Sequence, residues 1–207
     1  MDAYVAWLKT SKQNRPLLAV LRALGLFDRP ADAGCLAALH RSPVITGLTE
    51  PLVNLTEAQW NITLTRLAGC GLISRPERTA ENSLPALNDR QSLDTHPLIR
   101  TYFAKQLRAE NFRAWRTAHQ RLYEHLKASV PYRPEGLGGL QPLYQAVAHG
   151  CKAGPHERAC YEVFWDRILR GTGHDGFYSI HKLGAFDADL GAVACLRADF
   201  AARLERT

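Results

Sequence analysis

The pattern of apolar and polar positions at the start of the chain predicts two consecutive helices. After Asn14 and Pro16, leucines recur at helical spacing, at positions 17, 18, 21, 24 and 26. Proline is favoured in a first helical turn, so these residues predict a helix that begins near Asn14 and buries one face. The segment 31–40 predicts a second, shorter helix, and 41–55 predicts a connector.

A third helix is predicted to begin at Thr56. Its side chain can accept from the backbone three residues on while Gln59 reaches back, which is the capping-box pattern. The residues that share one face of this helix, and that we expect to be buried, are Trp60, Leu64 and Leu67.

The pattern then changes from helical spacing to short extended runs. We interpret 72–74 and 92–95 as two strands, and 76–90 as the polar loop of a hairpin between them. Three helices followed by a small β-hairpin wing are typical of a winged-helix domain, which we place at 13–105. Residues 1–12 are expected to form an N-terminal helix from a preceding domain.

Helical periodicity dominates the second half of the chain. A linker rich in proline and glycine, 130–139, and a short break at 153–155 separate its segments, and the break predicts an antiparallel helical hairpin. We therefore expect a mainly α protein in which repeated helical hairpins, typical of the start of a solenoid, occupy 111–207. The predicted helices are 112–129, 140–152, 156–169 and 188–205.

Composition narrows the class of protein. The 207 residues carry a formal net charge of +6, spread evenly along the chain, which gives mild attraction to polyanions but no basic face. No apolar run is long enough to span a membrane, and the N-terminus lacks the regions of a secretory signal. Five cysteines without a Cys-x-x-Cys pair favour reduced thiols, so we expect a cytoplasmic protein with no membrane contact.

The segment 93–103 combines an extended stretch with a histidine and a proline at a predicted helix start. Pro97 suits the first turn because the N–H groups of that turn lack partners within the helix. His96 then lies where backbone N–H groups and the helix dipole favour an anion such as a phosphate. Arg100, one turn later, is expected to pair with Asp94.

Two groups of residues resemble the bacterial STAND NTPases, signal-transducing ATPases related to NLR immune receptors. The run Leu-Arg-Ala-Leu-Gly-Leu-Phe-Asp-Arg-Pro at 21–30 resembles the opening of their winged-helix domain. Thr-His-Pro-Leu-Ile-Arg at 95–100 resembles their Met-His-Asp motif and its Leu-Ile-Arg tail, with threonine for methionine and proline for aspartate. The runs 146–154 and 177–186 resemble the tetratricopeptide (TPR) helices that follow in bacterial members. This resemblance implies that the helical hairpins at 111–207 are TPR-like repeats.

The resemblance implies a non-enzymatic regulatory and protein-interaction fragment. In the family, the motif histidine contacts the β-phosphate of ADP and holds the resting state, a role that carries over only to His96, with Arg100 in support. No Gly-Lys pair of a P-loop occurs here, so ADP or ATP would be held only together with a partner NTPase domain. The chain alone is expected to bind no cofactor.

The alternative function is a winged-helix DNA-binding regulator whose C-terminal helices dimerise or sense a partner. The polar face of the third helix would then contact bases, and binding would depend steeply on salt. The candidate contacts are Gln59, Asn61, Thr63 and Arg66.

Other chemistry is weakly indicated. No nucleophile motif occurs, so no catalytic residue is predicted. The residues with zinc-ligand composition, His149, Cys151, His156 and Cys160, match no standard spacing, and no metal is predicted. A series of aromatic residues is interpreted as helix-packing residues that would leave a groove for a peptide or partner helix: Trp115, Tyr123, Tyr144, Tyr161, Phe164 and Trp165. Arg167, Arg170 and Lys182 would form a basic rim there.

Overall fold

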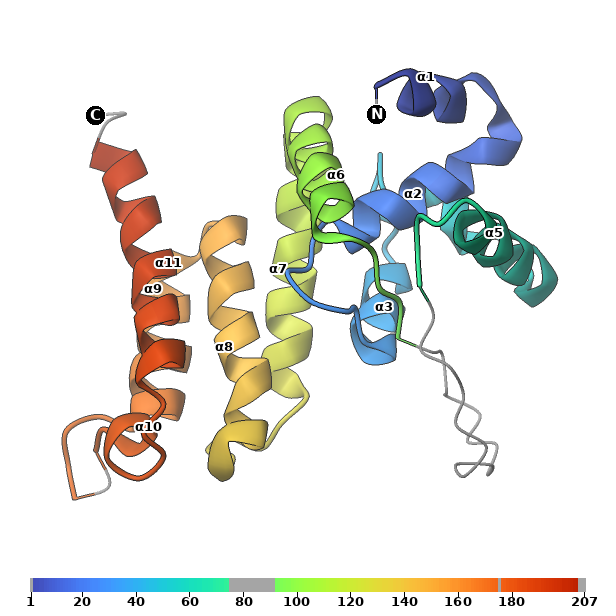
Figure 1. Cartoon of the computed structure of the whole chain (residues 1–207). Coiled ribbons are helices and arrows are strands. Elements are labelled where there is room, and N and C mark those ends of the chain that lie inside the picture. The colour runs from blue at the N-terminus through green and yellow to red at the C-terminus, as the bar shows by residue number, and fades with distance from the viewer. Residues whose placement is uncertain (1, 75–91, 175, 205–207) are drawn as a thin grey trace, which may run out of the picture. The chain divides into compact units, whose positions relative to one another are not determined.

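The structure, a computed structural model, describes residues 2–74, 92–174 and 176–204, and these residues are mainly helical (Figure 1). Within the described residues the extended segments form isolated bridges and no sheet. The chain divides into two compact units, Met1–Trp115 and Arg116–Thr207, and the boundary falls inside helix α7 (Phe112–Ala128). The predicted mainly α class is confirmed.

The first unit is built around α2. Its elements are α1 (Asp2–Thr10), the 3₁₀ turn η1 (Lys12–Asn14), α2 (Arg15–Leu24), α3 (Ala33–His40), α4 (Glu50–Val53), α5 (Glu57–Gly69) and α6 (Pro97–Glu110). Helix α2 packs against α1, α4, α5 and α6 and buries Leu17, Leu21 and Leu24 almost completely. A Cβ added to Gly25 would lie 2.7 Å from the Ala104 backbone nitrogen, so this glycine lets α6 approach the end of α2 closely.

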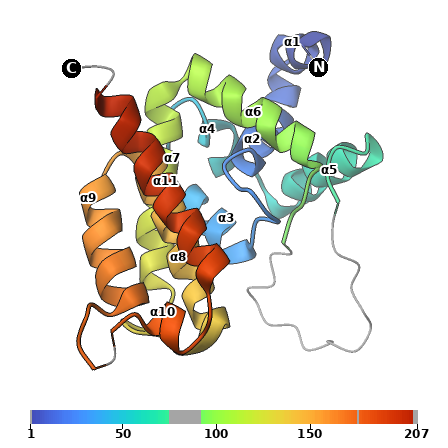
Figure 2. The same cartoon turned by 60° about the vertical axis from the view of Figure 1, so that its left-hand side comes forward.

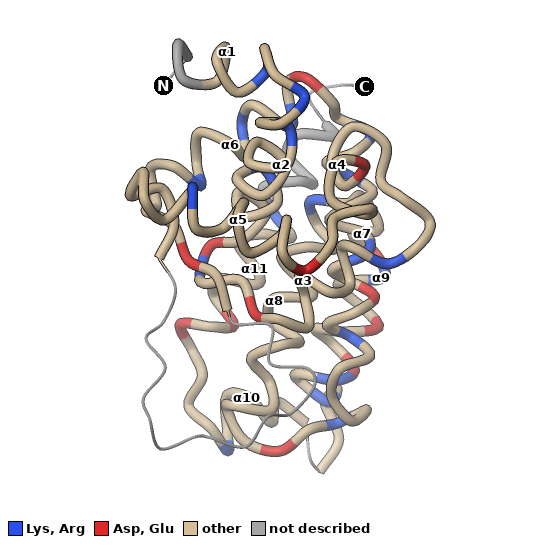
Figure 3. The backbone as a smooth tube through the Cα atoms, turned by 90° about the vertical axis from the view of Figure 1, so that its right-hand side faces the viewer, with Lys and Arg blue, Asp and Glu red and all other residues tan. Residues whose placement is uncertain are grey.

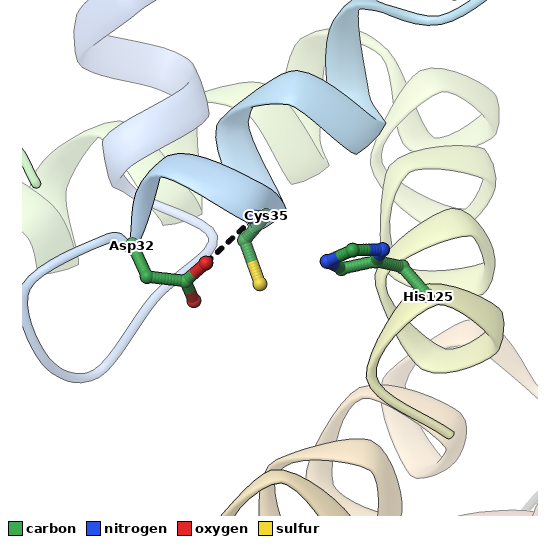
Figure 4. Close-up of side chains that lie close together, drawn as sticks. All are labelled: Asp32, Cys35 and His125. Atoms are coloured by element: carbon green, nitrogen blue, oxygen red, sulfur yellow. Dashed lines mark hydrogen bonds between the residues drawn. The ribbon is translucent and has the colours of Figure 1, made fainter. Parts of the chain in front are cut away.

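Local capping residues set the starts of several helices in the first unit. The Asp32 carboxylate accepts from the Cys35 backbone N–H at 2.8 Å and starts α3 (Figure 4). The capping box predicted at Thr56 and Gln59 is confirmed at the start of α5. These contacts are between neighbours in sequence, which is why the sequence alone located the helices.

The predicted wing is described only at its ends. Ser74 pairs with Asp94, and Ala31 pairs with Leu93, each as an isolated antiparallel bridge. The loop at 76–90 lies outside the described residues. The winged-helix topology therefore stays a prediction.

The second unit consists of helices packed around α8. After α7 come α8 (Gly136–Ala153), α9 (His156–Arg158), the π-helix η2 (Ala159–Leu169), α10 (Tyr178–His181) and α11 (Phe186–Leu204). Helix α8 packs against both η2 and α11 (Figure 2). The short turn at Gly154 joins α8 to the α9–η2 segment as a helical hairpin, as predicted.

Two predictions about the second unit are wrong. The residues 136–139, expected in a linker, form the first turn of α8. A Cβ on Gly139 would lie 2.9 Å from Cβ of Pro134, so this glycine permits close packing and does not mark a flexible segment. The helix expected over 156–169 is α-helical only for its first turn and continues as a π-helix.

Candidate functional sites

Helix α6 begins at His96, as the sequence predicted. His96 is the N-cap, and its Nδ1 accepts from the Leu98 backbone N–H at 3.3 Å. Pro97 occupies the first helical position. The His96 ring is exposed.

The backbone donors of this turn are already used. Pro97 has no N–H, the Leu98 N–H goes to the His96 ring, and the Ile99 and Arg100 N–H groups donate to the His96 carbonyl at 2.9 and 3.1 Å. The expected cradle of backbone N–H groups for an anion is therefore absent from this turn. Because Nδ1 accepts, the neutral imidazole carries its proton on Nε2, which is the donor that this turn presents.

Contacts of Arg100 and Thr95 hold the turn that carries His96 in place. Arg100 is buried, forms an ion pair with Asp94 and donates from Nε to the Thr95 carbonyl at 3.0 Å. The Thr95 hydroxyl donates to the Leu72 carbonyl. The predicted Arg100–Asp94 pair is confirmed, and Arg100 supports the turn from the interior.

The four candidate DNA contacts on α5 do not form one exposed polar face. Thr63 is buried and donates to the Gln59 carbonyl at 2.8 Å. Gln59 accepts from the Thr56 backbone, and Arg66 donates to the Asn14 side chain at 3.0 Å. Asn61 is exposed. Figure 3 shows basic and acidic positions interspersed along the backbone in this view, and Arg66 is the one basic residue among the four candidate contacts. DNA-binding proteins usually concentrate basic residues on one face.

The four residues of the second unit that have zinc-ligand composition do not come together in one cluster. His149 lies against His119, with 2.7 Å between the two Nδ1 atoms, and both residues are buried. Burial, with the charges of His149 and Lys152, holds the pKa of His119 well below its ordinary value. No group of three ligand atoms forms among the four residues singled out for zinc, all of which the structure describes: His149, Cys151, His156 and Cys160.

The aromatic series divides between core and surface. Trp115, Tyr123 and Phe164 are buried, as predicted, and Tyr144 is half-buried. Tyr161 and Trp165, expected in the core, are 67% and 41% exposed on η2. The prediction of helix-packing residues is wrong for these two.

An open groove of about 690 Å³ lies beside η2 in the second unit. We call it the η2 groove. Its lining residues come from the end of α7, the following turn and η2: Glu124, Lys127, Ala128, Val130, Tyr132, Tyr161, Glu162, Asp166 and Arg167.

Arg167 organises one wall of the η2 groove. It is buried, and its guanidinium donates to the carbonyls of Lys127, Val130, Pro131 and Tyr132 at 2.7–3.3 Å. These carbonyls include the end of α7, where a cation is favoured by the helix dipole. Arg167 thus fixes the turn that presents Tyr132.

The predicted basic rim is wrong for its two arginines. Arg167 is buried in the wall, and Arg170 donates to the Pro134 carbonyl at 2.9 Å and lies 3.4 Å above the Tyr178 ring centroid. Lys182 is exposed. Both arginines are therefore used inside the unit.

Four alternating charges join α7 to the α9–η2 segment, and the two cations among them lie over the ring of Tyr123. Lys127 lies 3.0 Å from Glu124 and 3.5 Å from Glu162, and Arg158 lies 3.0 Å from Glu162 and 3.5 Å from Glu124. We call this closed set the charge ring. The hydrogen bond from Arg158 is the largest cause that lowers the pKa of Glu162 below its usual range.

Two residues of the groove, Tyr132 and Asp166, were not predicted from the sequence. The Tyr132 hydroxyl donates to the Asp166 carboxylate, which Arg133 also binds at 2.8 Å. The hydrogen bond from Tyr132 is the first cause of the lowered pKa of Asp166. The two residues lie 34 positions apart along the chain, so no local pattern could have paired them.

Comparisons with known proteins add no assignment. No family model, no curated protein and no solved structure matches this chain. Among the described helices, none combines the length and apolar character that crossing a membrane requires. The functional argument therefore depends on the residues and their geometry.

Proposed function

We propose that this chain is a non-enzymatic regulatory module that binds a protein partner through the η2 groove. In this proposal it is a fragment of STAND type, with a winged-helix part at 13–105 and TPR-like helical hairpins at 111–207. The observation that carries the proposal is the η2 groove itself. Its volume of about 690 Å³ is large enough to hold a few side chains of a partner.

The groove exposes the residue types that protein interfaces use. Tyr132 and Tyr161 are 62% and 67% exposed, and both line it. Tyrosine is enriched at interfaces because its ring offers apolar area and its hydroxyl offers a hydrogen bond. Exposed tyrosines beside charged groups favour a protein partner over a membrane surface.

Uncommon backbone geometry occurs in η2, which lines the groove, and in the segment that follows η2. The π-helix η2 runs for eleven residues, whereas π-helical segments are rare and occur mostly as single turns at functional sites. Just beyond it, Arg170 and Phe177 have positive φ values of 63° and 53°. Such conformations are uncommon outside glycine and cluster at binding and switch regions.

The nucleotide latch is the part of the proposal that depends on the STAND resemblance. It is supported by one exposed donor, the Nε2–H of His96, on a turn fixed by Arg100 and Thr95. An NTPase domain of the partner would supply the ADP and the remaining phosphate contacts. His96 would then add one hydrogen bond to a phosphate oxygen.

Site-specific photo-crosslinking tests the groove. The full chain carries a benzophenone amino acid in place of Tyr161, and the control carries it in place of Phe112, an aromatic residue 48% exposed outside the groove. We expect a discrete adduct from position 161 in cells, absent from position 112. The captured protein is then identified and purified, and Tyr161→Ala is expected to weaken its binding to the chain about tenfold.

Three results would contradict the proposal: equal adducts at both positions, no adduct at 161, or undiminished binding by Tyr161→Ala. The latch has a separate test. If the captured partner is a P-loop NTPase, His96→Ala should speed the release of fluorescent ADP from the complex, whereas Lys105→Ala on the same helix should not. If the release of ADP is unchanged in His96→Ala, the proposed latch is contradicted, while the proposed role of the groove is unaffected.

A further inference from the structure

The cations that line the η2 groove have little hydrogen-bonding capacity left. Arg167 uses four of the five N–H groups of a guanidinium on backbone carbonyls, and it is buried. Lys127 lies between Glu124 and Glu162 and above the Tyr123 ring, with its Nζ 4.8 Å from the centroid. A ligand that brought carboxylates or phosphates would find few donors in the groove.

The carboxylates of the groove keep unused acceptor capacity. An ionised carboxylate offers about four lone-pair sites. Asp166 receives Tyr132 and Arg133, and Glu162 receives Lys127 and Arg158, so each has acceptor sites left over. The side chains of Glu124, Glu162 and Asp166 are 44%, 47% and 34% exposed, against 21% for Lys127.

The groove thus presents acidic acceptors beside exposed aromatic rings. A guanidinium matches both, because its planar face stacks on aromatic rings while its N–H groups bind carboxylates in pairs. Resting on the proposed function, we infer that the η2 groove binds an arginine-bearing peptide segment of its protein partner. The guanidiniums of Arg133 and Arg167 already lie 5.7 Å from the Tyr132 ring centroid. The arginine of the partner therefore stacks on the exposed ring of Tyr161 and donates to Asp166 and Glu162.

The test measures binding to the full chain by fluorescence anisotropy. The probe is a fluorescein-labelled peptide of repeated Ala-Arg-Leu, and its counterpart carries glutamate for arginine. We expect the arginine peptide to bind with a dissociation constant that rises with salt, because the contacts are charge-assisted and partly exposed. The glutamate peptide should not bind.

Variants then locate the site. The double variant Glu162→Gln and Asp166→Asn keeps the shape of both side chains and should weaken binding about tenfold. Glu157→Gln on the adjoining α9 is the matched control, since Glu157 is exposed and lies outside the groove lining. A second measurement avoids variants: amide shifts in a labelled chain should change at Tyr132, Tyr161 and Asp166 when the arginine peptide is added.

Several outcomes would overturn the inference. They are equal binding of both peptides, equal weakening by the Glu157 control, or amide shifts confined to residues outside the groove. If position 161 still forms its partner adduct while the arginine peptide fails to bind, the proposed interaction surface stands and only the arginine-bearing partner is lost. If both fail, the proposed function fails with the inference.

Discussion

The first turn of α6 and the η2 groove differ in what their polar groups have left to offer. At α6, the sequence contains a recognisable motif, yet its backbone N–H groups are absorbed by His96 itself. At the groove, no motif is evident, yet carboxylates and tyrosines remain exposed around a space of about 690 Å³. The first region presents one donor, and the second presents several acceptors.

The comparison teaches that a binding site depends on unused hydrogen-bonding capacity as well as on residue type. Both regions contain a buried arginine that donates to the backbone, to one carbonyl at Arg100 and to four at Arg167. Arg100 fixes one turn through Thr95 and Asp94, and Arg167 fixes another through four carbonyls. In each case the arginine is a positioning residue. The group available to a ligand is an exposed residue beside it, His96 at the α6 turn and Tyr132 at the groove.

The largest effect is expected from Arg167→Met. This change leaves four carbonyls around 127–132 without their donor while keeping the apolar stem. Because unsatisfied buried polar groups are costly, the free energy of unfolding should fall by about 3 kcal/mol. Urea unfolding followed by circular dichroism measures it.

Arg133→Met is the control for Arg167. Arg133 lies beside the same tyrosine, but its side chain is 44% exposed and pairs with Asp166 near the surface. Its loss should cost less than about 1 kcal/mol. Equal losses in the two variants would show that Arg167 does not organise the groove wall.

A smaller loss is expected from Arg100→Met in the first unit. Arg100 is buried but makes contacts with two residues, Thr95 and Asp94, so about 2 kcal/mol of unfolding free energy should be lost. Lys105→Met on the exposed side of α6 should stay within about 0.5 kcal/mol. If Arg100→Met loses no more unfolding free energy than Lys105→Met, Arg100 does not stabilise the His96 turn.

Helix starts were predictable because their causes are local. The Thr56 capping box and the His96–Pro97 start each depend on residues within three positions of one another. The change from α9 to η2 was not predictable. Val163, Phe164 and Ile168 are buried at a spacing that suits either an α-helix or a π-helix, so periodicity over eleven residues cannot distinguish them.

The candidate sites were predictable only where partners lie near in sequence. Asp94 and Arg100 are six positions apart, and their pair was expected and is confirmed. Arg167 was expected on a basic rim, but its partners lie 35 to 40 positions earlier, at carbonyls whose arrangement depends on packing. The glycines at 136–139 were misinterpreted for the same reason, because the close approach of Pro134 is a tertiary contact.

The buried pair His119 and His149 predicts a pH dependence in the second unit. The pKa of His119 is below its unfolded value in the folded chain, so the unfolded chain binds the proton first as the pH falls. Stability should be complete above about pH 6.5 and decline below it, by up to about 1.4 kcal/mol per pH unit. His119→Gln keeps a donor for His149 but cannot titrate, so unfolding free energies at a series of pH values should decline less steeply. Equal declines would assign the pH dependence to other groups.

The smallest effect is expected at His96, and it separates the cap from the latch. His96→Ala removes the acceptor for the Leu98 N–H and should lower the unfolding free energy by about 1 kcal/mol, whereas His96→Asn restores a capping oxygen and should stay close to the parent chain. Both variants lack the imidazole Nε2–H. A partner-dependent defect in ADP retention that appears in both, while only His96→Ala is destabilised, would assign the defect to the lost donor. A defect that follows stability, present in His96→Ala and absent in His96→Asn, would reduce His96 to a helix cap, and the η2 groove would be the one proposed binding surface left.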